Sequence, residues 1–151
     1  EIEPLVQRLV GVMKRLPGEK PIEWRTDIPD QRLILPVDQR DLEEILGNLM
    51  DNARKWASGH VAVRLIDAED GPVLVVEDDG PGVPETSHAD ILGGGVRLDR
   101  GVPGTGMGLA IVVDIASLYG GKVVLSRGAV LGGLKVSVVF PPVRSFQFRS
   151  I

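Results

Sequence analysis

Hydrophobic residues recur at helical spacing in three stretches of the chain, residues 1–15, 38–57 and 106–119. The middle stretch is the longest, and Asp38 stands where an N-cap residue would begin it. The last stretch is followed by Gly120, and glycine commonly ends helices. The pattern therefore predicts three helices. The apolar stripe of the middle one consists of Leu42, Ile45, Leu49, Ala53 and Trp56.

Shorter stretches that are rich in β-branched residues or alternate in polarity predict strands. They are residues 21–28, 32–37, 60–67, 72–77, 122–126 and 133–140. Residues 79–105 are rich in glycine and proline and have no clear period, and a loop of that length is often a functional lid. The order of elements predicts an α/β fold. It would be a two-layer α/β sandwich, with a mixed sheet of about five strands covered on one face by three helices and with a long lid.

The composition fits a single globular domain over residues 1–151, with 43% hydrophobic and 25% charged residues. The absence of cysteine excludes disulfides and thiolate metal sites. A net charge of -4 argues against nucleic acid as a partner. No apolar run approaches the roughly 18 residues that cross a membrane, and no signal-peptide pattern opens the chain. Because the chain begins at Glu1 rather than at methionine, we expect it to be a fragment of a longer protein.

The polar face of the middle helix carries the first candidate site. Asn48, Asn52 and Lys55 are spaced i, i+4 and i+7, so they share one face beside the apolar stripe. Asparagine competes with the helix for backbone hydrogen bonds, so two of them on one line in mid-helix need a reason. They could form a solvated face. Alternatively, amide oxygens suit Mg²⁺ and the lysine could bind phosphate, which would make this a ligand face.

A second candidate site lies where the strand over residues 72–77 ends in Asp78 and Asp79, just before Gly80 and Gly82. The aspartates could be solvated residues of an ordinary turn. If one of them is buried, its carboxylate could accept a hydrogen bond from the amino group of adenine. The same carboxylate would repel the carbonyl oxygen of guanine.

The third candidate is the glycine-rich segment 101–109 in front of the last helix. Glycines at a helix N-terminus leave backbone N–H groups open to an anion, which the helix dipole also favours. A flexible hinge would carry the same glycines. A dinucleotide-binding oxidoreductase would need the spacing G-x-G-x-x-G after a buried strand, whereas Gly104 to Gly108 read G-x-G-x-G. The oxidoreductase alternative is therefore disfavoured.

In order and spacing the three candidates resemble the N, G1 and G2 boxes of histidine kinase catalytic domains. These domains belong to a superfamily shared with DNA gyrase, the 90-kilodalton heat-shock chaperones and mismatch-repair ATPases. The N box resembles residues 44–55, the G1 box residues 78–82 and the G2 box residues 104–109. The sequence over residues 75–83 and 95–99 is most similar to that of PhoQ-type sensor kinases.

The resemblance implies a role for each matching residue in binding Mg²⁺ and ATP. Asn52 and Asn48 would bind Mg²⁺, and Asp78 would hold the adenine. Asn48 and Lys55 would contact phosphate, and Arg97 in the lid could meet the terminal phosphate. The other contacts to ATP would come from Trp56, Gly80, Gly82, Gly104, Thr105, Gly106, Met107, Gly108 and Leu109.

Asn48 also bears on the reaction that the resemblance implies. ATP-hydrolysing members of the superfamily place a glutamate four residues before the metal-binding asparagine, to activate water. An amide cannot serve as that base, so the site suits transfer of the γ-phosphate rather than hydrolysis. The acceptor would be a histidine on a separate dimerisation domain upstream, since His60 and His88 lack the helical context of an acceptor. A response regulator would follow as the second partner.

The parent protein implied by the resemblance is a membrane-bound homodimeric sensor with this domain in the cytoplasm, whereas the fragment alone is expected to be monomeric. One departure from the family pattern lies in the lid. The family often has a phenylalanine followed closely by a basic residue, and here residues 91–95 read Ile-Leu-Gly-Gly-Gly. This leaves open a degenerate module that binds a nucleotide or a partner protein without phosphotransfer. An ATPase of the same superfamily is disfavoured by Asn48.

Overall fold

The computed structural model describes residues 2–16, 21–29, 34–88 and 108–142. The strands form one sheet in the order β1-β2-β3-β5-β4, in which β1 and β2 are parallel and the other neighbours are antiparallel. The elements in chain order are α1 (Ile2–Arg15), β1 (Glu23–Asp27), α2 (Gln39–Trp56), β2 (His60–Ala68), β3 (Gly71–Asp78), η1 (Glu85–Ser87), α4 (Gly108–Leu118), β4 (Lys122–Arg127) and β5 (Leu134–Val139).

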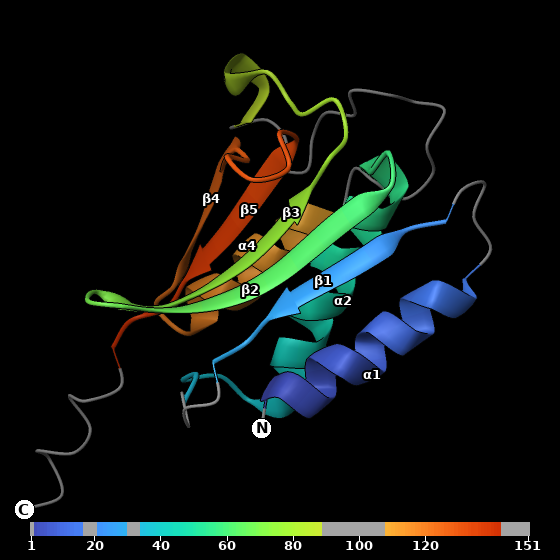
Figure 1. The fold of residues 1–151 in the computed structure, drawn as a ribbon. Helices are drawn as coiled ribbons and strands as arrows, with labels where there is room; N and C mark the ends of the chain where they lie inside the picture. The colour runs from blue at the N-terminus through green and yellow to red at the C-terminus, as the bar shows by residue number, and fades with distance from the viewer. Residues whose placement is uncertain (1, 17–20, 30–33, 89–107, 143–151) are drawn as a thin grey trace, which may run out of the picture.

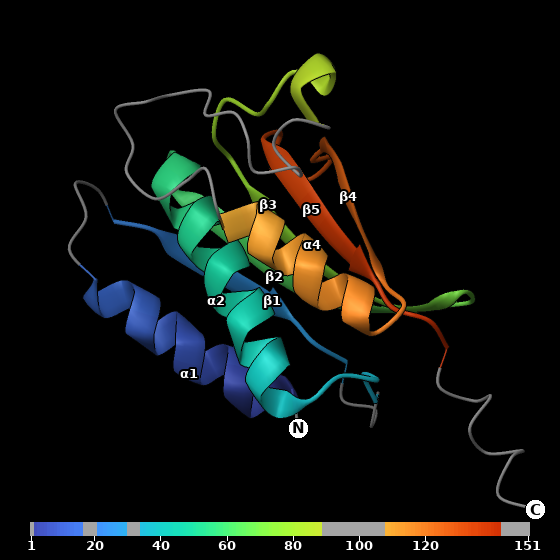
Figure 2. The ribbon, with the colours of Figure 1, turned by 180° about the vertical axis from the view of Figure 1, so that it is seen from behind.

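The three α-helices in the described residues lie together on one face of this mixed sheet (Figure 1), and Figure 2 shows α2 and α4 side by side on that face. Alternate strand residues point towards them, as in β5, where Leu134, Val136 and Val138 are buried. The predicted two-layer α/β sandwich is confirmed. Of the predicted lid over residues 79–105, residues 89–105 lie outside the described part of the chain, as do residues 106 and 107 of the predicted last helix. In the part that is described, no helix is long and apolar enough to cross a membrane.

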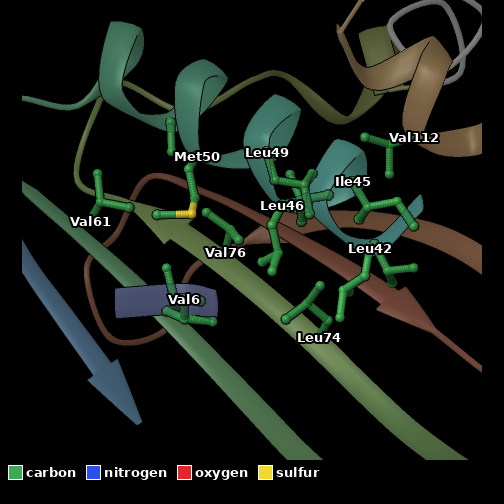
Figure 3. Packing of buried hydrophobic residues seen from close by; sticks show 14 of the residues in the cluster. Val6, Leu42, Ile45, Leu46, Leu49, Met50, Val61, Leu74, Val76 and Val112 are labelled. Carbon is green, nitrogen blue, oxygen red and sulfur yellow. The ribbon is translucent and has the colours of Figure 1, made fainter. Parts of the chain in front are cut away.

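A buried stripe of α2 forms the centre of the core, where it packs on Leu74 and Val76 of the sheet (Figure 3). Burying an aliphatic side chain of this size contributes about 1.5–3 kcal/mol, so the stripe fixes α2 firmly against the sheet. The polar face beside the stripe is thereby fixed as well. The buried apolar residues of α2 are Leu42, Ile45, Leu46, Leu49, Met50 and Ala53.

The strand predicted over residues 32–37 is wrong for residues 34–37, which are irregular. Pro36 has no N–H group to give to a neighbouring strand. The N–H group of Val37 donates instead to the carbonyl of Leu35 over 2.8 Å, within a tight turn. Among residues 34–37 only Leu35 is buried, and its side chain anchors this turn to the core. Residues 32 and 33 lie outside the described ranges.

The helices α2 and α4 are tied together near the C-terminus of α4, which ends at Leu118. Gly120, predicted as the glycine that terminates this helix, follows two residues later with φ +74°. Beside that glycine, the hydroxyl of Tyr119 donates to the carboxylate of Asp41 in α2. The same hydroxyl accepts the backbone N–H of Asp38 over 3.4 Å. Asp38 occupies the predicted N-cap position, but its side chain makes no capping hydrogen bond. The tyrosine therefore helps to hold the two helices together at this end.

Candidate functional site

The middle of α2 brings Asn48 against the first residue of α4. Asn48 Nδ2 donates to the carbonyl of Glu44, one turn earlier, over 2.8 Å. A β-carbon on Gly108 would lie 3.5 Å from Asn48 Oδ1, so the amide oxygen faces the beginning of α4. Asn52 lies one turn further along α2 and is only 8% exposed. Burial of this second asparagine means that it does not belong to a solvated face.

The C-terminal end of α2 holds two basic residues against one carboxylate. Asp51 Oδ2 lies 3.1 Å from Lys55 Nζ, and Asp51 Oδ1 lies 2.8 Å from Arg54 Nη2. Burial would raise the pKa of Asp51, but the hydrogen bonds from Arg54 and Lys55 outweigh it and lower the pKa. The carboxylate therefore stays charged and keeps the Lys55 ammonium at this end of the helix. Trp56, the last residue of α2, is half-buried.

Asp78, the last residue of β3, is a buried carboxylate that points to the helix side of the sheet. Its side chain is 2% exposed. Asp78 Oδ1 accepts the backbone N–H of Gly80 over 2.8 Å and that of Leu134 over 3.3 Å. Burial raises the pKa of Asp78, and the two hydrogen bonds lower it only in part. The sequence predicted that one of the two aspartates could be buried as an acceptor, and the structure identifies it as Asp78.

Two glycines let the chain close tightly around Asp78. A β-carbon on Gly80 would lie 2.2 Å from the carbonyl oxygen of Trp56, so only glycine lets this turn meet the end of α2. A β-carbon on Gly133 would lie 2.4 Å from Asp78 Oδ1 and 2.7 Å from the nitrogen of Gly80. Gly82 has φ +79°, which favours glycine. Gly133 was not predicted as a site residue, and its one signal in the sequence is the Gly132-Gly133 pair before β5.

The neighbouring Asp79 has a structural role that was not predicted. Its Oδ1 accepts the backbone N–H groups of Ser58 (2.7 Å) and Gly59 (3.0 Å), and its Oδ2 lies 2.9 Å from His60 Nδ1. Burial would raise the pKa of Asp79, but hydrogen bonds from Gly59, His60 and Ser58 outweigh it and lower the pKa to about 2. The other ring nitrogen of His60 lies 2.9 Å from Glu23 Oε2. Asp79 thus ties the turn after β3 to the turn after α2.

Replacing Asp79 with asparagine is expected to lower the free energy of unfolding at pH 7 by on the order of 1–2 kcal/mol, because the folded state lowers the pKa of this carboxyl. The stabilisation is present above the unfolded pKa near 4 and is lost as the pH falls towards 2. Urea unfolding at pH 7 and pH 2.5 measures it. The difference in unfolding free energy between wild type and variant should narrow at the lower pH, which approaches the folded pKa. Replacing the exposed Asp70 with asparagine is the control, and an equal loss there would contradict the assignment.

A cleft of about 590 Å³ opens between the segment that follows the Asp78 turn and the end of β4. A volume of this size is within the range of small-ligand pockets. It shares Gly82 and Gly133 with the turn around Asp78, so the cleft and the turn adjoin. The residues that line it are Pro81, Gly82, Val83, Pro84, Glu85, His88, Leu125, Ser126, Arg127 and Gly133.

The predicted glycine-rich segment before the last helix is described only in part. Gly108 is the first residue of α4 and lies against Asn48, as described above. Leu109 is buried in the core. The remaining predicted contacts of this region lie outside the described residues; they are Arg97, Gly104, Thr105, Gly106 and Met107.

Comparison with known proteins shows a family match and several sensor proteins. Residues 37–144 match the family of histidine kinase-, DNA gyrase B- and HSP90-like ATPases. The sensor protein kinase CarS of Pseudomonas aeruginosa is 47% identical over 109 residues, which are 72% of this chain and 24% of CarS. The sensor protein PhoQ of Escherichia coli (strain K12) is 32% identical over 139 residues, which are 92% of this chain and 28% of PhoQ. The chain therefore spans about a quarter of the length of these curated relatives.

A solved structure shares the fold. The crystal structure of full-length ShkA in complex with AMPPNP matches with a TM-score of 0.79 and 29% sequence identity. The match covers 93% of this chain and 30% of the ShkA chain. The sheet and the helices that position the candidate site are thus similar to those of a protein solved with a nucleotide ligand.

Proposed function

The chain belongs to the family of histidine kinase-, DNA gyrase B- and HSP90-like ATPases as an ATP-binding catalytic domain of the histidine kinase type, and on that premise we propose that it binds Mg-ATP and donates the γ-phosphate to a histidine on a separate dimerisation domain. The observation that best supports the proposal is the pair of contacts that α2 makes. Its middle meets Gly108 through Asn48, and its last residue meets Gly80 beside the buried Asp78. Asn52 lies on α2 between these two contacts.

Asp78 is the proposed ligand of the adenine base. Its Oδ1 is engaged by two backbone N–H groups, which hold the carboxylate in one orientation. Its Oδ2 would accept a hydrogen bond from the exocyclic amino group of adenine, whereas guanine would bring a carbonyl oxygen towards the same negative charge. In a buried site such a hydrogen bond is stronger than in water, and an unmatched group is costlier.

The donor set on α2 fits Mg²⁺. Amide oxygens are hard ligands, and Mg²⁺ is usually bound by one or two protein groups together with substrate phosphates. Among the residues that the structure describes, no three acidic, histidine or cysteine side chains are grouped to hold a metal by themselves. Asn52 and Asn48 would therefore hold the ion jointly with phosphate oxygens. When bound, Mg²⁺ supplies positive charge that the transferred phosphoryl group requires.

The residues around the phosphates favour transfer over hydrolysis. Asn48 is an amide whose NH₂ group already donates to Glu44, so it cannot take a proton from water. Lys55 would neutralise phosphate charge, and the N-terminus of α4 at Gly108 favours an anion. Arg97 and the segment 104–107, whose positions the structure does not describe, would complete the phosphate side, as the resemblance to the family implies. Positioning and charge neutralisation then drive the transfer.

The partners of the proposed reaction belong to the whole protein, of which this chain would be a part. The acceptor would be a histidine on a dimerisation domain of the same protein, and a response regulator would receive the phosphoryl group from it. We further propose that the parent is a membrane-bound homodimer with this domain on the cytoplasmic side. CarS and PhoQ are named as sensor proteins, which supports a signalling role.

Calorimetric titration of the chain tests the nucleotide class. ATP is expected to bind in the presence of Mg²⁺, because the Asn52 face and Asp78 together suit its phosphates and its base. NADP⁺, which carries a different arrangement of phosphates, is expected to give no heat of binding at the same concentrations. Binding of NADP⁺ without ATP would contradict the proposal and favour an oxidoreductase domain.

Adding the dimerisation domain of the parent protein together with radiolabelled ATP tests the transfer step. The label is expected to appear on the histidine of that domain, in an acid-labile form. A chain in which Asn52 is replaced by alanine serves as the control and should transfer no label. If the wild-type chain binds ATP but no label appears on the dimerisation domain, the result would favour the alternative of a degenerate module without phosphotransfer.

A further inference from the structure

Glu77 is a charged residue in a fully buried position of β3. Its side chain is 0% exposed, although it does not face the helices. Side chains alternate between the two faces of a strand, and Val76 packs under α2 (Figure 3). Glu77 therefore lies on the opposite face of the sheet from the helices, one residue before Asp78. A buried carboxylate at such a place requires partners that compensate for its lost hydration.

These partners come from β2 and from the turn that joins β4 to β5. Glu77 Oε1 accepts a hydrogen bond from Arg64 Nη2 over 2.9 Å. Glu77 Oε2 accepts the backbone N–H groups of Val130 over 3.1 Å and of Leu131 over 2.5 Å. Burial would raise the pKa of Glu77, but the N–H of Leu131 and the guanidinium of Arg64 outweigh it and lower the pKa. The residue is therefore an anion that holds the turn.

The turn between β4 and β5 is closed by its own backbone hydrogen bonds and lies against the Glu77 carboxylate. The N–H of Gly128 donates to the carbonyl of Gly133 over 2.8 Å, and the N–H of Gly132 donates to the carbonyl of Gly128 over 3.0 Å. A β-carbon on Gly128 would lie 2.1 Å from Glu77 Oε2. Only glycine lets the backbone approach the carboxylate so closely, and the turn is thus fixed as a unit over residues 128–133.

The far end of the same turn is held by the next residue of β3. The N–H of Gly133 donates to the carbonyl of Asp78 over 3.1 Å, and the N–H of Leu134 donates to Asp78 Oδ1 over 3.3 Å. The turn over residues 128–133 is therefore held by the carboxylate of Glu77 and by the backbone carbonyl of Asp78, and the residue that follows it, Leu134, donates to the Asp78 carboxylate. A movement of the turn away from Glu77 would displace Leu134, which follows the turn directly and donates one of the two hydrogen bonds that orient the Asp78 carboxylate.

We propose that Glu77 is a positioning residue for the nucleotide site, because it fixes the turn over residues 128–133, which in turn orients the carboxylate of Asp78. This inference rests on the proposed function, in which Asp78 binds adenine. Glu77 does not touch the nucleotide in this proposal. It acts only through the backbone N–H of Leu134, and its contribution should therefore appear in the selection of the base.

Replacing Glu77 with glutamine tests the proposal. The amide keeps the shape, but its NH₂ group would face the N–H donors of the turn or the Arg64 guanidinium. We expect the Kd for ATP to rise about 10-fold and the preference for ATP over inosine triphosphate, which has a carbonyl in place of the amino group, to fall several-fold. The amide hydrogen of Leu134 should exchange faster by NMR. The matched control replaces the exposed Glu69 with glutamine.

A second variant covers the case in which Glu77→Gln does not fold. Gly128→Ala places a methyl group against Glu77 Oε2 and should push the turn outwards, with the same loss of base preference. Gly11→Ala is its control, since a β-carbon at Gly11 meets nothing within 4 Å. A merely structural role would lower the melting temperature and leave the ratio of the two nucleotide affinities unchanged.

The outcomes separate this inference from the proposed function. Wild-type chain that binds ATP, with an unchanged ATP to inosine triphosphate ratio and unchanged Leu134 exchange in the folded variants, would overturn the positioning role alone. Wild-type chain that binds no ATP would overturn the proposed function and this inference together. A reduced ratio with faster Leu134 exchange would support both.

Discussion

Replacing Asn52 with alanine is expected to abolish Mg²⁺-dependent binding of ATP, with a loss of affinity for Mg-ATP on the order of 100-fold or more. Asn52 is 8% exposed and lies on α2 between the contact to α4 and the contact to the Asp78 turn. Its amide oxygen is the proposed protein ligand of the ion, and alanine offers no oxygen in its place. Titration with ATP in excess Mg²⁺ and again in EDTA measures the effect. In EDTA the wild type and the variant should bind ATP equally weakly.

Gly47→Ala provides a control on the same helix. A β-carbon on Gly47 meets nothing within 4 Å, and alanine has a higher helix propensity than glycine, so this variant should fold and bind Mg-ATP like the wild type. Thermal melting of both variants checks that the fold is kept. If Asn52→Ala binds ATP in Mg²⁺ with unchanged affinity, Asn52 has only a structural role in α2.

The helix that carries Asn52 could be predicted from the sequence because the signals that define it are local. The hydrophobic period over residues 38–57 predicted α2 (Gln39–Trp56) to within one residue at each end. Four of the five residues of the predicted stripe are buried, and the fifth, Trp56, is half-buried where the helix ends at the Gly80 turn. A period fixes the faces of a helix, so the location of the two asparagines beside the stripe followed directly.

The resemblance to the family singled out Asp78, but the residues alone could not distinguish the roles of the three consecutive acids, because most of their partners are remote in the sequence. Glu77, Asp78 and Asp79 are all acidic residues at the end of a strand, and their residue types alone do not distinguish them. Their roles depend on the face to which each points and on backbone donors from the turn after α2 and from residues 128–134. Those donors are brought near only when β3 pairs with β5 and α2 packs on the sheet. The register of a sheet and the path of a turn depend on tertiary contacts, which a local sequence pattern does not specify.

The wrong strand over residues 34–37 has a similar cause. Aliphatic residues favour strands, but that preference depends on a partner strand and on side-chain packing. Pro36 removes one of the ladder donors, and Leu35 reaches the core from an irregular segment. A single buried residue beside a proline is thus a weak signal for a strand, even where its neighbours are hydrophobic.

Replacing Asp78 with asparagine is expected to invert the preference of the site between ATP and inosine triphosphate. Only an oxygen can accept the N–H groups of Gly80 and Leu134, so the amide oxygen should take the place of Oδ1. The NH₂ group then takes the place of Oδ2 and meets the base as a donor. It would oppose the amino group of adenine and pair with the carbonyl of hypoxanthine. The ratio of the two affinities should shift by about 1000-fold, measured by titration with each nucleotide.

The stability of the same variant separates a role in binding from a role in folding. Because folding raises the pKa of Asp78, the folded state disfavours its charged form, and at pH 7 the ionised carboxylate costs stability. A neutral asparagine should therefore be at least as stable as the wild type in urea at pH 7. Asp79→Asn should do the reverse, with lower stability and an unchanged preference for ATP, because folding lowers the pKa of Asp79. Loss of stability in Asp78→Asn with the base preference intact would show that Asp78 holds the turn and does not read the base.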